Sequence, residues 1–374
     1  MTICLSIFAG IILYTYFLYP LLLLGVARLP HRKTRATRDA PLPKLTFIVA
    51  AHNAEAAIEE KILNTLQCAY PEDKIEYIFV SDGCTDETDN IIKKYPSIHL
   101  ISLGNRLGKE QALRQAINCA DSEVLCFSDV GTLLEVDALE KLATNFSDPD
   151  VGAVSSYDRS LSVETTLESI HVWYEFLLRK LESEISSCVG VSGSLFLARM
   201  DMCKLLTTDC CSDLAITFIC VKHNYRSVLE KSAYGYYSNT TSVKQEFSRK
   251  KRTIVHGINA VIKHKEVLSV FKYGFFSWQV LSHKILRWLS PVAFMVVLFL
   301  SGVKFFEGLD LRWLASGGYG VLLMALLAIT AMVFLKRLRT NTWLFFAYNT
   351  ALLAALIDVM RRKKLTVWQP TERR

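Results

Sequence analysis

Acidic and amide side chains follow three short apolar runs of the sequence, and their types suit the binding of a charged ligand. Asp129 follows residues 124–127, Asp82 follows residues 77–80, and Asn53 follows residues 45–50. A carboxylate at a strand end can bind the base or ribose of a nucleotide, or a divalent cation on a pyrophosphate. Taken singly, an Asp also commonly caps a helix and Asp-Gly commonly forms a turn. Recurrence at a second strand end favours a site.

The apolar runs alternate with segments of helical spacing. Strands are predicted at residues 45–50, 77–80, 98–103 and 124–127, and helices at residues 54–66, 85–94 and 109–119. This βαβα order predicts an α/β fold whose mostly parallel sheet is covered by helices on both faces. Ligands of such sheets bind beyond the carboxyl ends of the strands. The polar turns should therefore meet at one edge of the sheet.

The composition indicates an integral membrane protein. Of the 374 residues, 51% are hydrophobic, and the mean hydropathy is +0.25. Residues 3–27 carry no charge, which is long enough to cross ~30 Å of hydrocarbon. Five basic residues between positions 28 and 38 then place the following chain in the cytoplasm. We expect an uncleaved anchor at residues 1–28, a cytoplasmic domain at residues 41–245, and multi-pass insertion in a bacterial inner membrane.

The composition changes again after Lys244. Residues 246–288 mix basic and aromatic side chains and are expected to form amphipathic helices at the membrane interface. Apolar runs at 287–303 and 342–357 are borderline in length, and one at 313–335 is long enough to cross, so residues 289–360 should hold transmembrane helices. Residues 361–374 form a basic tail, which is cytoplasmic only if the last run does not cross.

Charge and cysteine usage argue against other classes of function. The net charge of +7 is concentrated near the expected membrane boundaries, which favours membrane lipids as partners over nucleic acid. Nine of the ten cysteines lie in the expected cytoplasmic domain, without a CxxC pair or a Cys/His spacing suited to zinc. They are interpreted as reduced thiols that are mostly buried.

In combination, the polar segments resemble the membrane-bound branch of the family 2 glycosyltransferases. That branch includes hyaluronan, chitin, cellulose and other exopolysaccharide synthases, and ceramide glucosyltransferase. The matching segments are IVAAHNAE (48–55), VSDGCTD (80–86), RLGK (106–109), FSDVGT (127–132), VGVSGSLFLAR (189–199), DCCSDL (209–214) and RKKRT (249–253). The resemblance implies a GT-A nucleotide-sugar domain, which has a Rossmann-like fold.

The resemblance also implies roles for individual residues. Nucleotide-sugar or acceptor contacts fall on Asn53, Glu55, Asp82, Lys109, Asp129, Ser192, Gly193, Arg249 and Trp368. Asp129 takes the place of the metal motif, which implies Mg²⁺ or Mn²⁺. Arg252 takes the place of an arginine that clamps the diphosphate, although four consecutive basic residues at 249–252 also suit a lipid-facing surface.

Asp213 is the candidate general base. Attack of a hydroxyl on an anomeric carbon needs a carboxylate within hydrogen-bond reach to take the proton. The resemblance places Asp213 in that role and implies a single displacement with inversion. The alternative interpretation is that Asp213 is the N-cap of a helix at residues 214–222.

Several positions depart from the pattern of the family. Gly131 stands where the metal motif has its second ligand, so one carboxylate would need phosphates and waters to complete the coordination. Ala54, Arg114, Ser212 and Thr253 also replace usual residues of the motifs. These departures keep open a catalytically impaired homologue that serves as a nucleotide-binding or scaffold subunit.

The function expected from the sequence is transfer of a sugar from a nucleotide sugar, UDP-linked, to a growing polysaccharide or a lipid acceptor. Asp82, Lys109, Asp129, Asp213 and Arg252, the residues on which this chemistry depends, are all present. A homo-oligomer or a partner protein would help to export a polymer. The sugar, the acceptor and the processivity stay open.

Overall fold

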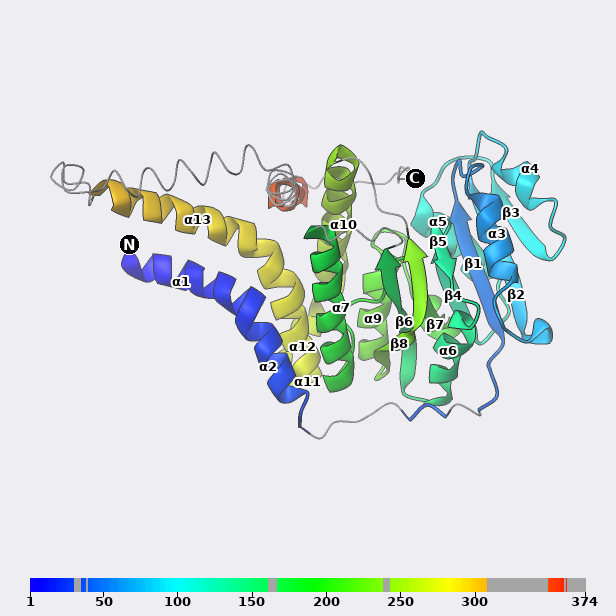
Figure 1. Ribbon diagram of the computed structural model, residues 1–374, viewed down its shortest axis with the longest axis horizontal. Coiled ribbons are helices and arrows are strands. Elements are labelled where there is room, and N and C mark those ends of the chain that lie inside the picture. Colours follow the sequence, from blue (N-terminus) through cyan, green and yellow to red (C-terminus); the bar gives the residue numbers. More distant parts are fainter. Residues whose placement is uncertain are drawn as a thin grey trace.

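The computed structural model describes residues 1–29, 35–37, 40–160, 167–237, 243–307, 349–359 and 361. It is elongated, with a mixed sheet at one end and long apolar helices at the other (Figure 1). The expected crossing at 313–335 and Trp368 lie outside the described residues, as does all but Arg361 of the tail at 361–374.

The described strands form one sheet in the order β3-β2-β1-β4-β7-β6-β8-β5. Their bounds are β1 Leu45–Ala51, β2 Ile75–Asp82, β3 Ile98–Leu103, β4 Val124–Asp129, β5 Thr132–Leu134, β6 Val151–Ser160, β7 Leu195–Arg199 and β8 Arg226–Tyr237. Strands β1 to β4 are mutually parallel where they pair, as the βαβα order predicts. Strand β7 runs antiparallel between β4 and β6, which makes the complete sheet mixed.

The chain order reverses beside β1, because β2 pairs with one edge of β1 and β4 with the other. In an α/β sheet, this reversal opens a crevice at the carboxyl ends of the two strands. Asp129 lies at this point, opposite Ala50 in the register of β1 and β4. The topology therefore puts the ends of β1 and β4 where a ligand is expected.

Helices cover both faces of the sheet, which confirms the predicted α/β architecture. The helices around the sheet are α3 Ile58–Leu66, α4 Thr88–Ile92, α5 Lys109–Cys119, α6 Ala138–Thr144, α8 Met200–Cys203 and α9 Ser212–Lys222, with short 3-10 turns η2 Glu72–Lys74 and η3 Asn145–Ser147. Alternate residues of β1 point to opposite faces. Ile48 packs in the core with α5 and α9, and Phe47 and Val49 pack in the core with α3 and α6.

Two apolar helical segments, at residues 2–26 and 275–307, pack together. They comprise α1 Thr2–Leu13, η1 Tyr14–Leu18 and α2 Tyr19–Val26 at the start, and α12 Phe275–Val280, η5 Leu281–Ile285 and α13 Leu286–Glu307 later. Helix α1 lies along α13 (Figure 1). The segments Thr2–Val26 and Phe275–Lys304 are each long and apolar enough to span a membrane. The domain boundary expected at 288/289 falls inside α13.

Two amphipathic helices stand between the sheet and the apolar helices (Figure 1). They are α7 Leu167–Ile185 and α10 Val243–Lys263, and the short elements η4 Lys265–Leu268 and α11 Val270–Tyr273 follow α10. Glu182 of α7 is fully buried and accepts hydrogen bonds from Tyr19 Oη at 2.7 Å and from His283 Nδ1 at 2.7 Å. Both long apolar segments are thereby attached to α7.

Candidate functional site

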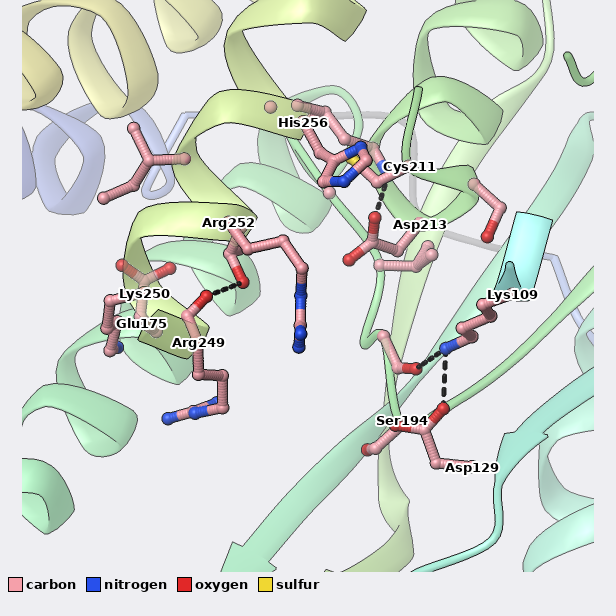
Figure 2. A pocket seen from close by; sticks show the side chains of 18 of the residues that line it. Lys109, Asp129, Glu175, Ser194, Cys211, Asp213, Arg249, Lys250, Arg252 and His256 are labelled. Atoms are coloured by element: carbon pink, nitrogen blue, oxygen red, sulfur yellow. Dashed lines mark hydrogen bonds and ion pairs between the residues drawn. The ribbon is translucent and has the colours of Figure 1, made fainter. Parts of the chain in front are cut away.

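A cavity of about 2000 Å³ lies beyond the ends of β1 and β4 and contains most of the residues singled out from the sequence. Its lining includes Asn53, Lys109, Asp129, Gly193, Asp213, Arg249 and Arg252. Figure 2 shows that Lys109, Asp129 and Ser194 lie on one side, Asp213 and His256 on another, and Arg249 and Arg252 on α10. Six separate segments of the chain therefore converge on one space.

Lys109 and Asp129 form an ion pair at the floor of this cavity. Lys109 begins α5, Asp129 ends β4, and Nζ lies 2.6 Å from Oδ1 (Figure 2). Burial alone would lower the pKa of Lys109, but the charge of Asp129, with smaller contributions from Glu110 and Asp213, raises it. The ammonium is therefore held in its charged form at neutral pH.

Asp213 lies in the first turn of α9 and is not its N-cap, which is Cys211. The alternative interpretation of Asp213 as a helix cap is therefore wrong. Its Oδ1 accepts the Leu214 N–H at 2.9 Å. Its Oδ2 faces Gly193, and a Cβ added to Gly193 would lie 2.9 Å from that oxygen. The absence of a side chain at position 193 thus makes room for the carboxylate.

Asp82 is nearly fully buried, with 2% of its surface exposed, behind the loop that precedes α5. Its two carboxylate oxygens accept the Leu107 N–H at 2.6 Å and the Gly108 N–H at 2.8 Å. Gly83 has φ +60°, and a Cβ there would lie 2.5 Å from the Arg106 nitrogen. The Asp-Gly pair therefore fixes the loop that leads to Lys109, while Leu107 and Gly108 line the cavity.

Asn53 and Glu55 connect the turn after β1 to the turn after β2. Asn53 Oδ1 accepts the Thr85 N–H at 2.9 Å, and Glu55 Oε2 accepts the Glu87 N–H at 3.2 Å. Asn53 lines the large cavity, whereas Glu55 lines a smaller surface depression beside α3. The helix expected at residues 85–94 is shorter in the structure, because α4 spans Thr88–Ile92 and has Glu87 as its N-cap.

Ser192 and its neighbours are held by an aspartate that the sequence patterns did not reveal. Asp158, near the end of β6, accepts hydrogen bonds from Ser192 Oγ at 2.6 Å and Ser194 Oγ at 2.7 Å. Arg179 of α7 lies 3.8 Å from the same carboxylate. Ser192 is fully buried, whereas its neighbours Gly193 and Ser194 line the cavity.

Arg249, Arg252 and His256 project into the cavity from α10 (Figure 2). Burial and the neighbouring charge of Arg249 lower the pKa of Arg252, against the opposing effect of Asp129. Burial and the charge of Arg252 also lower the pKa of His256, against the effect of Asp213, so the imidazole is neutral at pH 7. The three residues share one face because they recur at helical spacing.

Residues that the sequence patterns did not reveal complete the surroundings of the site. The residues added by the structure are His256, Asp158, Glu110 and Lys61. The spacing of His256 four residues after Arg252 was a usable signal, because both then lie on one helical face. No sequence signal identified Lys61, because it lies in the apolar face of α3. It is fully buried and donates a hydrogen bond to Ser128 Oγ at 2.7 Å, next to Asp129.

The residues at Asp129 offer a divalent cation one carboxylate. Gly131 contributes no side chain, Lys109 already contacts Oδ1, and no cluster of three or more Asp, Glu, His or Cys side chains suited to a metal occurs within the described part of the chain. A hard cation could attach here only if diphosphate and water supplied its other ligands. The donor set therefore fits a cation carried by the ligand and does not fit a resident metal.

The cavity also extends to the apolar helices. Tyr16 and Phe17 of η1, Trp173 of α7, and Ser290 and Phe294 of α13 belong to its lining. Phe17 is 63% exposed and Trp173 is 58% exposed, so this end of the cavity is open and apolar. One continuous space thus joins the polar site to the surface of the two candidate membrane spans.

Comparison with known proteins relates the part of the chain that carries Lys109, Asp129 and Gly193 to a known family. Residues 46–206 match the family model "Glycosyl transferase family 2". A poly-beta-1,6-N-acetyl-D-glucosamine synthase of Staphylococcus aureus (strain COL) is 31% identical over 133 residues, which cover 34% of this chain and 32% of that protein. The probable glycosyltransferase YdaM of Bacillus subtilis (strain 168) is 29% identical over 136 residues, which also cover 34% and 32%.

A similar structure supports the fold over nearly the whole chain. The mannosyltransferase PcManGT from Pyrobaculum calidifontis, solved in complex with GDP-Man and Mn²⁺, matches with a TM-score of 0.76 and 21% identity, over 96% of this chain and 99% of that one. The match shows a GT-A-like fold. The chain spans about a third of the length of the curated relatives that it matches. The motifs and the family model agree on residues 46–206, which match a family 2 glycosyltransferase domain, and the fold is GT-A-like.

Proposed function

We propose that this chain is an integral membrane inverting glycosyltransferase that uses a nucleotide sugar, UDP-linked, at the cytoplasmic face of a bacterial inner membrane. The observation that supports the proposal most is the convergence of Lys109, Asp129, Asp213 and Arg252 in one cavity. The cationic side chains of Lys109 and Arg252 would face the diphosphate of the donor. A carboxylate on a different element would face the acceptor. This division of charge is what a glycosyl transfer needs.

The reaction proceeds by one displacement. Asp213 takes the proton of the acceptor hydroxyl, and the hydroxyl oxygen forms a bond to the anomeric carbon. The bond between that carbon and the diphosphate oxygen breaks, and the nucleoside diphosphate leaves with the electron pair. Lys109 and Arg252 offset the added negative charge, because a guanidinium and an ammonium bind phosphate oxygens well in a partly dehydrated site.

We propose that the acceptor approaches from the membrane side, as a lipid or as a growing polysaccharide. The continuity of the cavity from Asp213 to Tyr16, Phe17 and Phe294 supports this direction. A donor would then enter from the side of Asn53, Leu107 and Gly108. The similarity to a polysaccharide synthase supports a sugar polymer as one product and UDP-N-acetylglucosamine as one donor to test.

A divalent cation would bind between Asp129 and the donor diphosphate, where it would add positive charge for the leaving group. We expect EDTA to weaken donor binding to the wild-type chain at least about tenfold, since a bound cation would offset the repulsion between Asp129 and the donor diphosphate. Asp129→Asn should bind the donor more weakly and should lose the response to EDTA. Calorimetric titration with nucleoside diphosphate, with and without Mn²⁺, measures the affinity of each variant and its dependence on the cation. Equal EDTA sensitivity in Asp129→Asn would remove Asp129 as the metal contact.

The second candidate function is a nucleotide-binding subunit without turnover. Gly131 in place of a second metal ligand favours it. Purified full-length chain in detergent is incubated with a panel of UDP- and GDP-sugars that includes UDP-N-acetylglucosamine and GDP-mannose, in the presence of membrane lipids. Release of free nucleotide from one donor supports the enzyme. Nucleotide binding without release from any donor supports the second candidate, and product size then separates single transfer from polymerisation.

A further inference from the structure

A carboxyl group from a different helix lies beside the candidate base. Glu110 follows Lys109 in the first turn of α5 and lines the cavity. Its Oε1 accepts the backbone N–H of Ser212 at 3.3 Å. Ser212 begins α9, and Asp213 is the next residue. Glu110 therefore connects the helix that begins at Lys109 to the helix that carries Asp213.

This contact satisfies a group that α9 cannot satisfy by itself. The first backbone N–H groups of a helix have no intrahelical acceptor, and an anion near them is favoured by the helix dipole. The N-cap residue Cys211 makes no capping hydrogen bond through its side chain. Glu110 supplies the missing acceptor although it is 102 residues away in the sequence.

We propose that Glu110 is a positioning residue for Asp213: by capping α9 from α5, it fixes the carboxylate that takes the proton of the acceptor. The inference rests on the glycosyl transfer proposed above. It also links the cation side and the base side of the cavity, because consecutive residues, Lys109 and Glu110, contact Asp129 and Ser212 respectively.

The electrostatic surroundings of Glu110 make this cap sensitive to pH. Burial has the largest effect and, with the charge of Asp213, raises the pKa of Glu110 to about 7, against the opposing charge of Lys109. The other titratable groups that face it are the thiols of Cys210 and Cys211, in the loop before α9. A carboxylate is a stronger acceptor than a carboxylic acid, so the cap weakens below neutral pH.

Kinetics of three variants test the role. Glu110→Ala should lower kcat about tenfold or more and leave the donor KM within about twofold, because misplacing a catalytic group slows the chemical step. Glu110→Gln keeps an acceptor oxygen and should retain most of kcat, but it should lose the pH dependence of kcat near 7. Glu140→Ala is the matched control, because Glu140 is an exposed glutamate in the first turn of α6. An unchanged kcat in Glu110→Ala, or a loss confined to the donor KM, overturns the proposal.

A titration that needs no turnover tests the contact itself. The infrared band of protonated carboxyl groups is followed from pH 5 to 9 in the folded chain. A component that disappears near pH 7 should be present in the wild type and in Glu140→Gln, and missing from Glu110→Gln. Its midpoint should fall in Asp213→Asn, because that variant removes a like charge. If no donor is turned over but the midpoint shifts, the proposed function fails and the Glu110–Asp213 link stands. An unshifted midpoint overturns the link.

Discussion

The charge and the position of the polar side chains in this site depend on their immediate neighbours. Lys109 is charged because Asp129 is 2.6 Å away, and Asp213 has room because residue 193 is glycine. Asp82, which the sequence resemblance assigned to the nucleotide, uses both carboxylate oxygens on the backbone of the Leu107–Gly108 loop. Its role toward the nucleotide stays a prediction, and its hydrogen bonds indicate that it acts through the loop.

Asp213→Asn should abolish turnover and leave donor affinity nearly unchanged. The amide has the size of the carboxylate but cannot take a proton, and loss of general base catalysis costs about 10²–10⁴ in rate. Nucleotide release and calorimetric binding of the nucleoside diphosphate measure the two parts. Normal turnover in this variant would exclude Asp213 as the base.

Lys61→Met should change how stability depends on pH. Lys61 is fully buried, and its burial lowers its pKa to about 8. Between pH 8 and the unfolded value near 10.4 the unfolded chain binds more protons at this residue, so stability rises with pH, by up to about 3 kcal/mol. The Met variant should lack this rise, whereas the exposed Lys93→Met should follow the wild type. Urea unfolding at pH 7 to 10 measures the free energy of unfolding of each variant. The same dependence on pH in Lys61→Met and wild type would contradict the prediction.

At the scale of elements, the site is built from the ends of helices and strands. Strand β4 ends at Asp129, helix α5 begins at Lys109, helix α9 begins one residue before Asp213, and the segment before β7 brings Gly193 between them. Helix α10 adds Arg252 and His256 from its side. The packing of whole helices and strands sets the positions of these side chains. Small changes at the contacts between the elements should therefore affect the rate of the reaction more than the stability of the fold.

Gly193→Ala should lower kcat about 10- to 100-fold, because the new Cβ would lie 2.9 Å from Asp213 Oδ2 and would displace the carboxylate. The thermal midpoint should change little. Gly104→Ala is the control, because a Cβ there meets nothing within 4 Å. Unchanged kinetics of Gly193→Ala would mean that the carboxylate adopts another position during the reaction.

At the scale of the molecule, α7 joins the domain that contains the sheet to the apolar helices. Glu182 binds Tyr19 and His283, and Glu175 pairs with His283 and Arg287. The charge of Arg287 helps to hold the pKa of Glu175 well below its usual range, although burial opposes this. Farther along α7, Arg179 contacts Asp158 beside the Ser192 segment. One helix therefore contacts both ends of the cavity.

Glu182→Ala should destabilise the detergent-solubilised chain by about 3 kcal/mol or more, because the change leaves Tyr19 and His283 without their buried partner. Glu184→Ala on the same helix should cost less than about 1 kcal/mol, since its ion pair with Lys231 is exposed to water. Thermal unfolding of both variants measures the difference. Similar midpoints for the two would show that the buried contacts do not hold the apolar helices to the domain.

The sequence by itself determined the features that depend on local pattern. Alternating strands and helices predicted the parallel half of the sheet, because burial on both faces makes strand segments continuously apolar. The strand-end and helix-start motifs identified Lys109, Asp129 and Asp213, and uncharged length identified the first apolar helix. The antiparallel placement of strand β7 beside β4 left no such local mark.

Only the tertiary structure decided which distant groups meet. Glu110 contacts Ser212, Asp158 holds Ser192, His256 lies near Asp213, and Glu182 joins Tyr19 to His283. None of these pairs has a spacing that a period of 2 or 3.6 residues can reveal, because each joins separate elements. Their meeting follows from how the helices pack on the sheet, which depends on the burial of many side chains at once.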